Sequence, residues 1–176
     1  MIEPIMKIHL TAGTCEIPDT GVFLSTIGSI ASKYGITVQA IDADMIAGRE
    51  HVIAAAEKAI RAMGRSCNIS GDLGMEILLH ASGNRQIKKA LSMGVRNGRN
   101  NIIIVAVGEN IPAAVAGELE NLVDSSDAVD VTCYRPGKRD SIVSFFGITE
   151  REIAAVGETK IPELVLERVA LVDVLK

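Results

Sequence analysis

Residues 102–107 read IIIVAV, and this stretch decides the fold class. It is the longest unbroken apolar run in the chain, and β-branched side chains dominate it. Such a run predicts a strand that is buried on both faces, at the centre of a sheet. It is far too short to span a membrane.

Two further strands and several helices are expected around this run. Residues 5–10 and 36–41 have strand character. Helical spacing of apolar residues predicts helices over 20–34, 48–63, 72–81, 84–93, 112–123 and the segment that begins after Ile161-Pro162. The predicted ends include Gly35, Gly64, the candidate cap Ser70 and a capping box from Thr149 to Glu152.

Two segments are less regular. Residues 128–134 are predicted as a strand, and residues 142–146 fit either a helix or a strand. Helices and strands mix without sustained β-α-β alternation. We therefore expect a mixed α/β (α+β) fold, with a small central mixed or antiparallel sheet surrounded by helices. No linker and no internal repeat divides the chain, which predicts a single domain over residues 1–176.

The composition narrows the functional class. Cys15, Cys67 and Cys133 are widely spaced and odd in number, so buried free thiols are expected rather than a disulfide or a zinc site. Aromatic residues make up 3% of the chain, which argues against stacking of bases on an aromatic platform. The first residues lack the features of a signal peptide, so the expected compartment is the cytoplasm.

Charges are segregated along the chain, although the net charge is −4. Residues 77–108 contain no acidic residue, and residues 108–134 contain no basic one. The basic residues Arg85, Lys88 and Lys89 have the spacing that places side chains on one helix face. Two interpretations stay open at this point: the segments neutralise or solvate each other, or the basic one forms a patch that binds phosphates.

Catalytic motifs are absent or weak. The chain has no GxxxxGK[ST] loop, no GxSxG elbow and no metal-binding histidine pair. His80 is expected to be a packed core residue. We therefore expect no enzyme activity, no cofactor and no metal. The alternative is a small-molecule or nucleotide-binding enzyme domain that uses Gly71 to Gly74 as an anion-binding loop.

Three stretches carry a family resemblance. Residues 51–59 (HVIAAAEKA) are followed by residues 76–87 (EILLHASGNRQI) and 90–94 (ALSMG). They resemble the kinase-binding small subunit of the KEOPS tRNA-modification complex, the family of the PRPK-binding protein TPRKB. Residues 147–157 and the Leu-rich C-terminal region are similar to its archaeal members. The resemblance covers most of the chain from Gly48 onward.

This resemblance implies a non-catalytic regulatory subunit that binds the complex's atypical kinase and supports formation of threonylcarbamoyladenosine in tRNA. It also implies binding of the tRNA 3′ CCA end. No ligand set can be carried over by residue, so the charge map supplies the candidate RNA contacts: Lys58, Arg61, Arg65, Asn84, Arg85, Gln86, Lys88 and Lys89. The candidate kinase-binding residues lie on the strongly apolar last helix: Leu164, Leu171, Val172 and Leu175. A regulator that binds the kinase but no RNA is a further alternative.

Overall fold

The computed structural model describes residues 5–125 and 130–174, and its sheet is built around the IIIVAV run. Strand β3 (Gly98–Gly108) is the middle strand, with β1 (Lys7–Ile17) on one side and β2 (Thr37–Asp42) on the other. Both neighbours pair with β3 in antiparallel register, Ile17 opposite Gly98 and Asp42 opposite Ile102. The mixed α/β fold is therefore confirmed, with the sheet in its antiparallel form.

The chain forms two compact units. The sheet unit comprises Met1–Ala43 and Gly94–Val131, and the helical unit comprises Asp44–Met93 and Thr132–Lys176. Each unit is built from two separate stretches of the sequence. The expectation of one domain over residues 1–176 stays a prediction.

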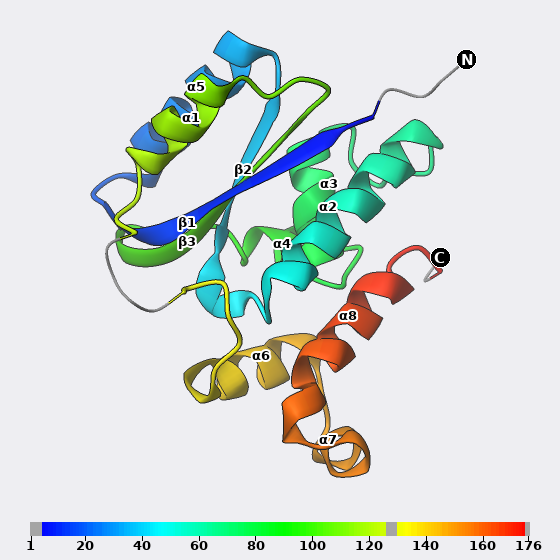
Figure 1. Ribbon diagram of the computed structural model, residues 1–176. Helices are drawn as coiled ribbons and strands as arrows, with labels where there is room; N and C mark the ends of the chain where they lie inside the picture. Colours follow the sequence, from blue (N-terminus) through cyan, green and yellow to red (C-terminus); the bar gives the residue numbers. More distant parts are fainter. Residues whose placement is uncertain (1–4, 126–129, 175–176) are drawn as a thin grey trace. The chain divides into compact units, whose positions relative to one another are not determined.

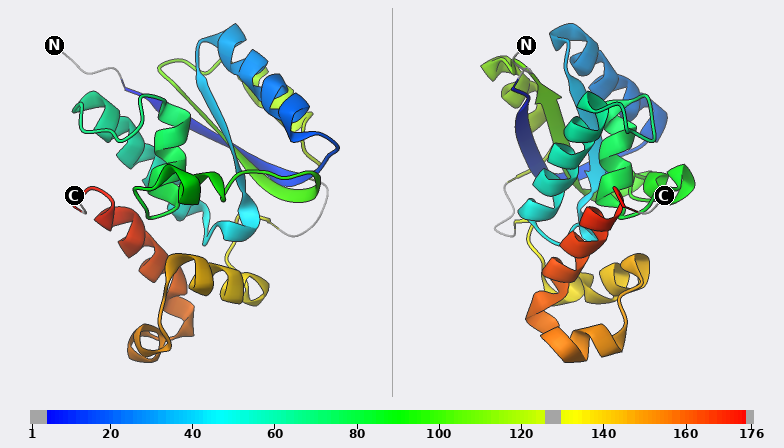
Figure 2. Two further views of the ribbon diagram at one scale, coloured as in Figure 1. Left: turned by 180° about the vertical axis from the view of Figure 1, so that it is seen from behind. Right: turned by 90° about the vertical axis from the view of Figure 1, so that its right-hand side faces the viewer.

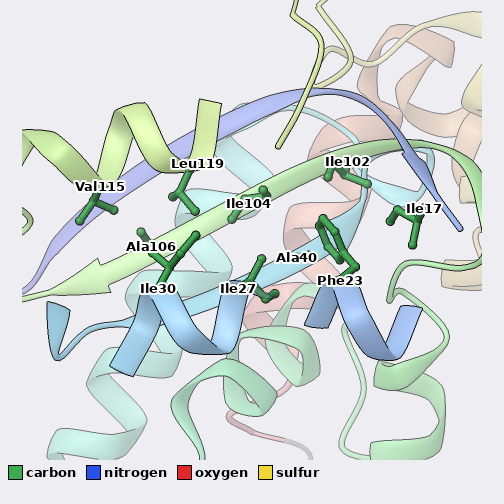
Figure 3. Close-up of a cluster of buried hydrophobic side chains, with 10 residues drawn as sticks. All are labelled: Ile17, Phe23, Ile27, Ile30, Ala40, Ile102, Ile104, Ala106, Val115 and Leu119. Atoms are coloured by element: carbon green, nitrogen blue, oxygen red, sulfur yellow. The ribbon is translucent and has the colours of Figure 1, made fainter. Parts of the chain in front are cut away.

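Two helices cover one face of the sheet in the sheet unit. Helix α1 (Thr20–Tyr34) packs against β2, and α5 (Ala113–Glu120) packs against β1 and α1, as Figure 1 shows. Figure 3 shows the resulting hydrophobic core, in which α1 contributes Phe23, Ile27 and Ile30. These positions recur at helical spacing, so α1 buries one stripe and leaves its other face exposed.

Local signals fix the ends of α1. Asp19 accepts a hydrogen bond from the backbone N–H of Val22 at 3.0 Å, which caps the start of the helix. Gly35 adopts a left-handed conformation with φ of 62°, which ends it. The predicted helix over 20–34 is therefore confirmed at both ends.

The helical unit contains the remaining six of the eight α-helices found among the described residues. Their bounds are α2 (Arg49–Gly64), α3 (Leu73–Ala81), α4 (Ile87–Leu91), α6 (Arg139–Phe146), α7 (Glu150–Val156) and α8 (Ile161–Leu171). Helix α2 packs against α3 and α8, and α3 also packs against α4. Figure 2 shows α6, α7 and α8 following one another along the chain. Three short 3₁₀ helices occupy Ala43–Met45, Pro136–Lys138 and Glu158–Lys160.

Several helix and strand boundaries in the structure differ from those predicted from the sequence. The first strand extends to Ile17, because its polar second half also pairs with β3. Asp72, not Ser70, caps α3, since its carboxylate accepts from the N–H of Met75 at 2.8 Å. The cap that ends α2 is Arg65 rather than Gly64. Residues 142–146, which the sequence left open, belong to the helix α6.

The predicted strand over 128–134 is wrong where it can be compared. Residues 126–129 lie outside the described part, and residues 130–134 form turns and irregular backbone. Val131 and Thr132 are buried there. A segment with strand propensity forms a strand only where a neighbouring strand is available to pair with it.

The three cysteines agree with the sequence prediction in part. None of Cys15, Cys67 and Cys133 forms a disulfide, as expected, but Cys67 and Cys133 are exposed rather than buried. Within residues 5–125 and 130–174, no helix is long and apolar enough to cross a lipid bilayer.

The predicted capping box opens α7 and ties this helix to α8. The carboxylate of Glu152 accepts from the N–H and hydroxyl of Thr149, at 2.8 and 2.9 Å, and from Arg168 Nη2 at 2.7 Å. The Thr149 backbone N–H, followed by Arg168 and the Thr149 hydroxyl, lowers the pKa of Glu152 to about 2. The charged form is thus the one that the folded chain favours.

Replacing Glu152 with glutamine should lower the melting temperature at neutral pH. As the pH falls from 5 to 2, the melting temperature of the variant should also fall less than that of the wild type. The stabilisation by Glu152 is fully present above the unfolded-state pKa of 4.5 and is lost as the pH falls toward 2. Thermal unfolding at pH values between 5 and 2 measures this difference. Glu57→Gln, at an exposed position on α2, is the control. Equal pH profiles for the two variants would contradict the assignment.

Candidate nucleic-acid interface

Two of the predicted RNA-contacting arginines are exposed at the end of α2. The opposite stripe of this helix is buried: Val52, Ala55, Ala56, Ala59 and Ala62. Arg61 and Arg65 therefore project away from that stripe. Among the described residues, neither has an ion-pair partner. Both are available to bind an anion.

Lys58 lies one turn earlier on α2 and is already paired. Its Nζ atom is 3.0 Å from Oδ2 of Asp173, which follows α8. The Lys58 side chain is 21% exposed and that of Asp173 is 41% exposed. A pair this exposed contributes modestly to stability. Lys58 is thus a basic residue whose charge the chain itself partly neutralises.

The predicted face of Arg85, Lys88 and Lys89 is wrong in its geometry. The helix α4 is shorter than predicted, so Arg85 precedes it and donates from Nη1 to the carbonyl oxygen of Val172 at 3.2 Å. The Nζ atom of Lys89 lies 4.8 Å from the centre of the Phe145 ring, in a cation–π contact. Lys88 is exposed and has no ion-pair partner among the described residues.

The turn before α4 explains why that helix is short. Gly83 has a φ of +61°, and the Oδ1 atom of Asn84 accepts from the N–H of Gln86 at 2.8 Å. This local bond holds residues 84–86 outside the helix. The side-chain oxygen of Asn84 therefore shapes the turn, while Gln86 stays exposed.

A buried cluster of ionisable side chains, which the sequence did not predict, lies between α3 and the end of α8. Glu76 has no exposed surface, and its carboxylate accepts from the backbone N–H groups of Ile69 and Ser70 at 2.8–3.2 Å. His80 is 1% exposed, as expected for a core residue. Its Nε2 atom lies 3.5 Å from Glu76 Oε1 and 3.7 Å from Asp173 Oδ1.

The other ring nitrogen of His80 is unsatisfied. Nδ1 is buried and has no hydrogen-bond partner in the part of the chain that is described. Burial lowers the pKa of His80, although the nearby carboxylates of Asp173 and Glu76 act in the opposite direction. A cavity of about 80 Å³ adjoins the cluster, with this lining: Cys67, Ile69, Glu76, His80, Arg85, Val172 and Asp173. The sequence signal was the i,i+4 spacing of Glu76 and His80 on an apolar helix.

The alternative anion-binding loop at Gly71 to Gly74 is poorly placed to bind an anion. The carboxylate of Asp72 itself caps the start of α3. The N–H groups of Ile69 and Ser70, which precede the loop, already donate to Glu76. An incoming anion would meet two carboxylates, so this observation favours a structural loop. No group of three or more metal-binding side chains occurs in the described ranges, and the expectation of no cofactor stays a prediction.

The predicted kinase-binding residues differ in exposure. Leu164 is 8% exposed and Val172 has no exposed surface, so both side chains belong to the chain's own core. Leu171 is 38% exposed. Leu175 lies outside the described residues. Of these three described residues, only Leu171 has a side chain exposed enough to contact a partner, because Leu164 and Val172 are packed in the chain's own core.

Comparison with known protein families gives a match over residues 24–173. The family is described as kinase binding protein CGI-121. The matched region runs from α1 past the end of α8 and includes all of the candidate RNA contacts. The comparison with curated proteins gives no match.

Proposed function

The chain belongs to the family of kinase binding protein CGI-121, and we propose that it is the adaptor subunit of a KEOPS-type complex. In this role it binds the atypical kinase of the complex and helps to recruit tRNA by its 3′ CCA end, for threonylcarbamoyladenosine formation in the cytoplasm. It catalyses no reaction itself. The family membership supports the kinase-binding part, and the resemblance of residues 51–94 to the small KEOPS subunit supports the rest.

The observation that carries the RNA-binding part is a set of exposed, unpaired cations on an acidic chain. Arg61, Arg65 and Lys88 belong to the helical unit, and none has an ion-pair partner among the residues described. Arg96, a further cation of the basic segment, instead forms an ion pair with Asp42 at 3.3 Å. Exposed cations of this kind bind phosphates through charge, and their contribution decreases as salt rises.

The kinase-binding surface is proposed to include Leu171. This side chain is at the end of α8 and is partly exposed. A partner interface requires an apolar centre with a polar rim. The exposed residues of α1, Val22 and Leu24, are a second proposed contact.

Reversing one charge, Lys88→Glu, should weaken binding to intact tRNA by about tenfold at low salt. The substitution replaces an attraction for phosphate with a repulsion, and it should reduce the slope of log affinity against log salt by about 1. Stability should change little, because Lys88 is exposed. Fluorescence anisotropy with labelled tRNA at two salt concentrations measures both quantities.

Arg151→Glu provides the matched control, since Arg151 is an exposed cation on α7 in the same unit and has no ion-pair partner within the described part of the chain. It should reduce affinity much less than Lys88→Glu. Binding to tRNA without its 3′ CCA should be weaker than to intact tRNA. Absence of binding to either RNA would refute tRNA recruitment and leave a regulator that binds the kinase alone. Equal losses in the two variants would remove Lys88 from the interface.

A further inference from the structure

Two consecutive residues that follow α8 engage two of the cations proposed to bind RNA. The carbonyl oxygen of Val172 accepts from Arg85 Nη1 at 3.2 Å, and Oδ2 of Asp173 lies 3.0 Å from Lys58 Nζ. All four residues belong to the helical unit. The segment after α8 therefore occupies a cationic site rather than simply ending the helix.

The carboxylate of Asp173 also lies beside the buried histidine. Its Oδ1 atom is 3.7 Å from Nε2 of His80, so one carboxylate is placed between a lysine and an imidazole. Glu76 is the other carboxylate of this cluster. Its oxygens are directed to the backbone N–H groups of Ile69 and Ser70 and are shielded from solvent. Arg85 and Asp173 line the cavity that adjoins the cluster, and Lys58 pairs with Asp173.

The position of Asp173 is unfavourable on local grounds. A carboxylate just beyond the end of a helix faces the negative end of the helix dipole. The nearby cations, not the helix, therefore account for its placement. Arg85 has the opposite relation, because a cation that donates to the last carbonyl groups of α8 is favoured there.

From these contacts we infer that Asp173 is an internal competitor of RNA phosphate at a site flanked by Lys58 and Arg85. A carboxylate and a phosphate oxygen are both anionic acceptors for the same cations. Because Asp173 is tethered, its effective concentration at the site is in the millimolar range or above. An RNA phosphate must displace it, so a polyanion with several contacts is favoured over a small phosphate compound. This inference rests on the proposed tRNA binding.

Removal of the competitor should tighten tRNA binding. Asp173→Asn should raise the affinity for intact tRNA by about two- to fivefold at low salt, the range expected for release of an exposed ion pair. Asp140→Asn is the matched control, since Asp140 is almost fully exposed and pairs with Arg139 at 3.4 Å, away from the cluster. It makes the same change in net charge and should alter affinity much less. Asp173→Ser provides a second variant, and thermal unfolding verifies that each is folded.

A double-mutant cycle with Lys58→Ala locates the effect. In that background, Asp173→Asn should gain no more affinity than Asp140→Asn, because the competing pair is already broken. If the wild type binds tRNA and both Asp173 variants match Asp140→Asn, the competitor is refuted while tRNA recruitment stands. If neither the wild type nor any Asp173 variant binds tRNA, both proposals fail. Binding by the Asp173 variants alone would support the competitor in its strongest form.

Discussion

Lowering the pH from 7 to 4.5 should destabilise the protein by about 2–3 kcal/mol through one side chain, His51. This residue on α2 is 1% exposed. Its Nδ1 atom accepts from the N–H of Ala47 at 3.1 Å, and its Nε2–H donates to the carbonyl oxygen of Ala81 at 2.8 Å. The neutral ring thus satisfies one donor and one acceptor, and a second proton would break the bond to Ala47.

Burial lowers the pKa of His51 from 6.5 to about 4, with a further contribution from the positive charge of Lys138. The folded chain binds the proton more weakly than the unfolded one. The stabilisation is therefore complete above pH 6.5 and is lost as the pH falls from 6.5 toward 4. Urea unfolding between pH 7 and 4.5 measures the loss, and the imidazole resonances in NMR report the titration directly.

The variant that tests this assignment is His51→Asn. Asparagine at position 51 retains an acceptor for the N–H of Ala47 but does not titrate, so its unfolding free energy should be lower at pH 7 and flatter between pH 6.5 and 4.5. Titration of the His51 ring near pH 6.5 would contradict the argument.

Gly83→Ala should reduce the free energy of unfolding by about 3 kcal/mol, from two separate causes. The residue has a φ of +61°, a backbone conformation that is strained for any residue with a Cβ atom. A Cβ atom there would also lie 2.9 Å from Cβ of Arg168 and 3.3 Å from its carbonyl carbon. Neither atom can move without a shift of α8. Chemical denaturation measures the loss.

Gly147→Ala separates the two causes. Gly147 has the same φ of +61°, belongs to the same helical unit, and has open space around its Cα atom. Only the backbone strain applies to it, so its cost should be about 1–2 kcal/mol. The excess cost at Gly83 is the steric contact with α8. Equal costs at both positions would show that α8 yields freely to the extra methyl group.

The sequence predicted the elements whose signals are local. The IIIVAV run, the stripe of α1 and the Thr149 capping box each depend on neighbouring residues, and each was placed correctly. The fold class followed, because an apolar run between helices predicts a covered sheet. The second half of β1 was not predicted, because its residues carry no clear local strand pattern and form a strand by pairing with β3.

The candidate site was predicted less completely, because its geometry depends on contacts distant in sequence. The charge map identified Lys58 and Arg85 as candidate contacts, but their partners Asp173 and Val172 lie 115 and 87 positions away in the sequence. The expected face of Arg85, Lys88 and Lys89 failed because the Asn84 turn ends the helical path before Ile87. Periodicity cannot detect a side chain that bonds to its own backbone.

The division of each unit between two separate stretches has a consequence for how the chain is made. Strand β3 pairs Gly108 with Lys7 and Gly98 with Ile17, so the pairing of β1 with β3 joins residues 81 to 101 positions apart. A growing chain that leaves the ribosome from its N-terminus can form α1 early but has no middle strand until Gly108 has emerged. In the helical unit, α2, α3 and α4 can pack on one another early, but the contacts of α2 and α3 with α8 form only after α8 has emerged. Native contacts of such long range fold slowly, and both cores are therefore completed late in synthesis.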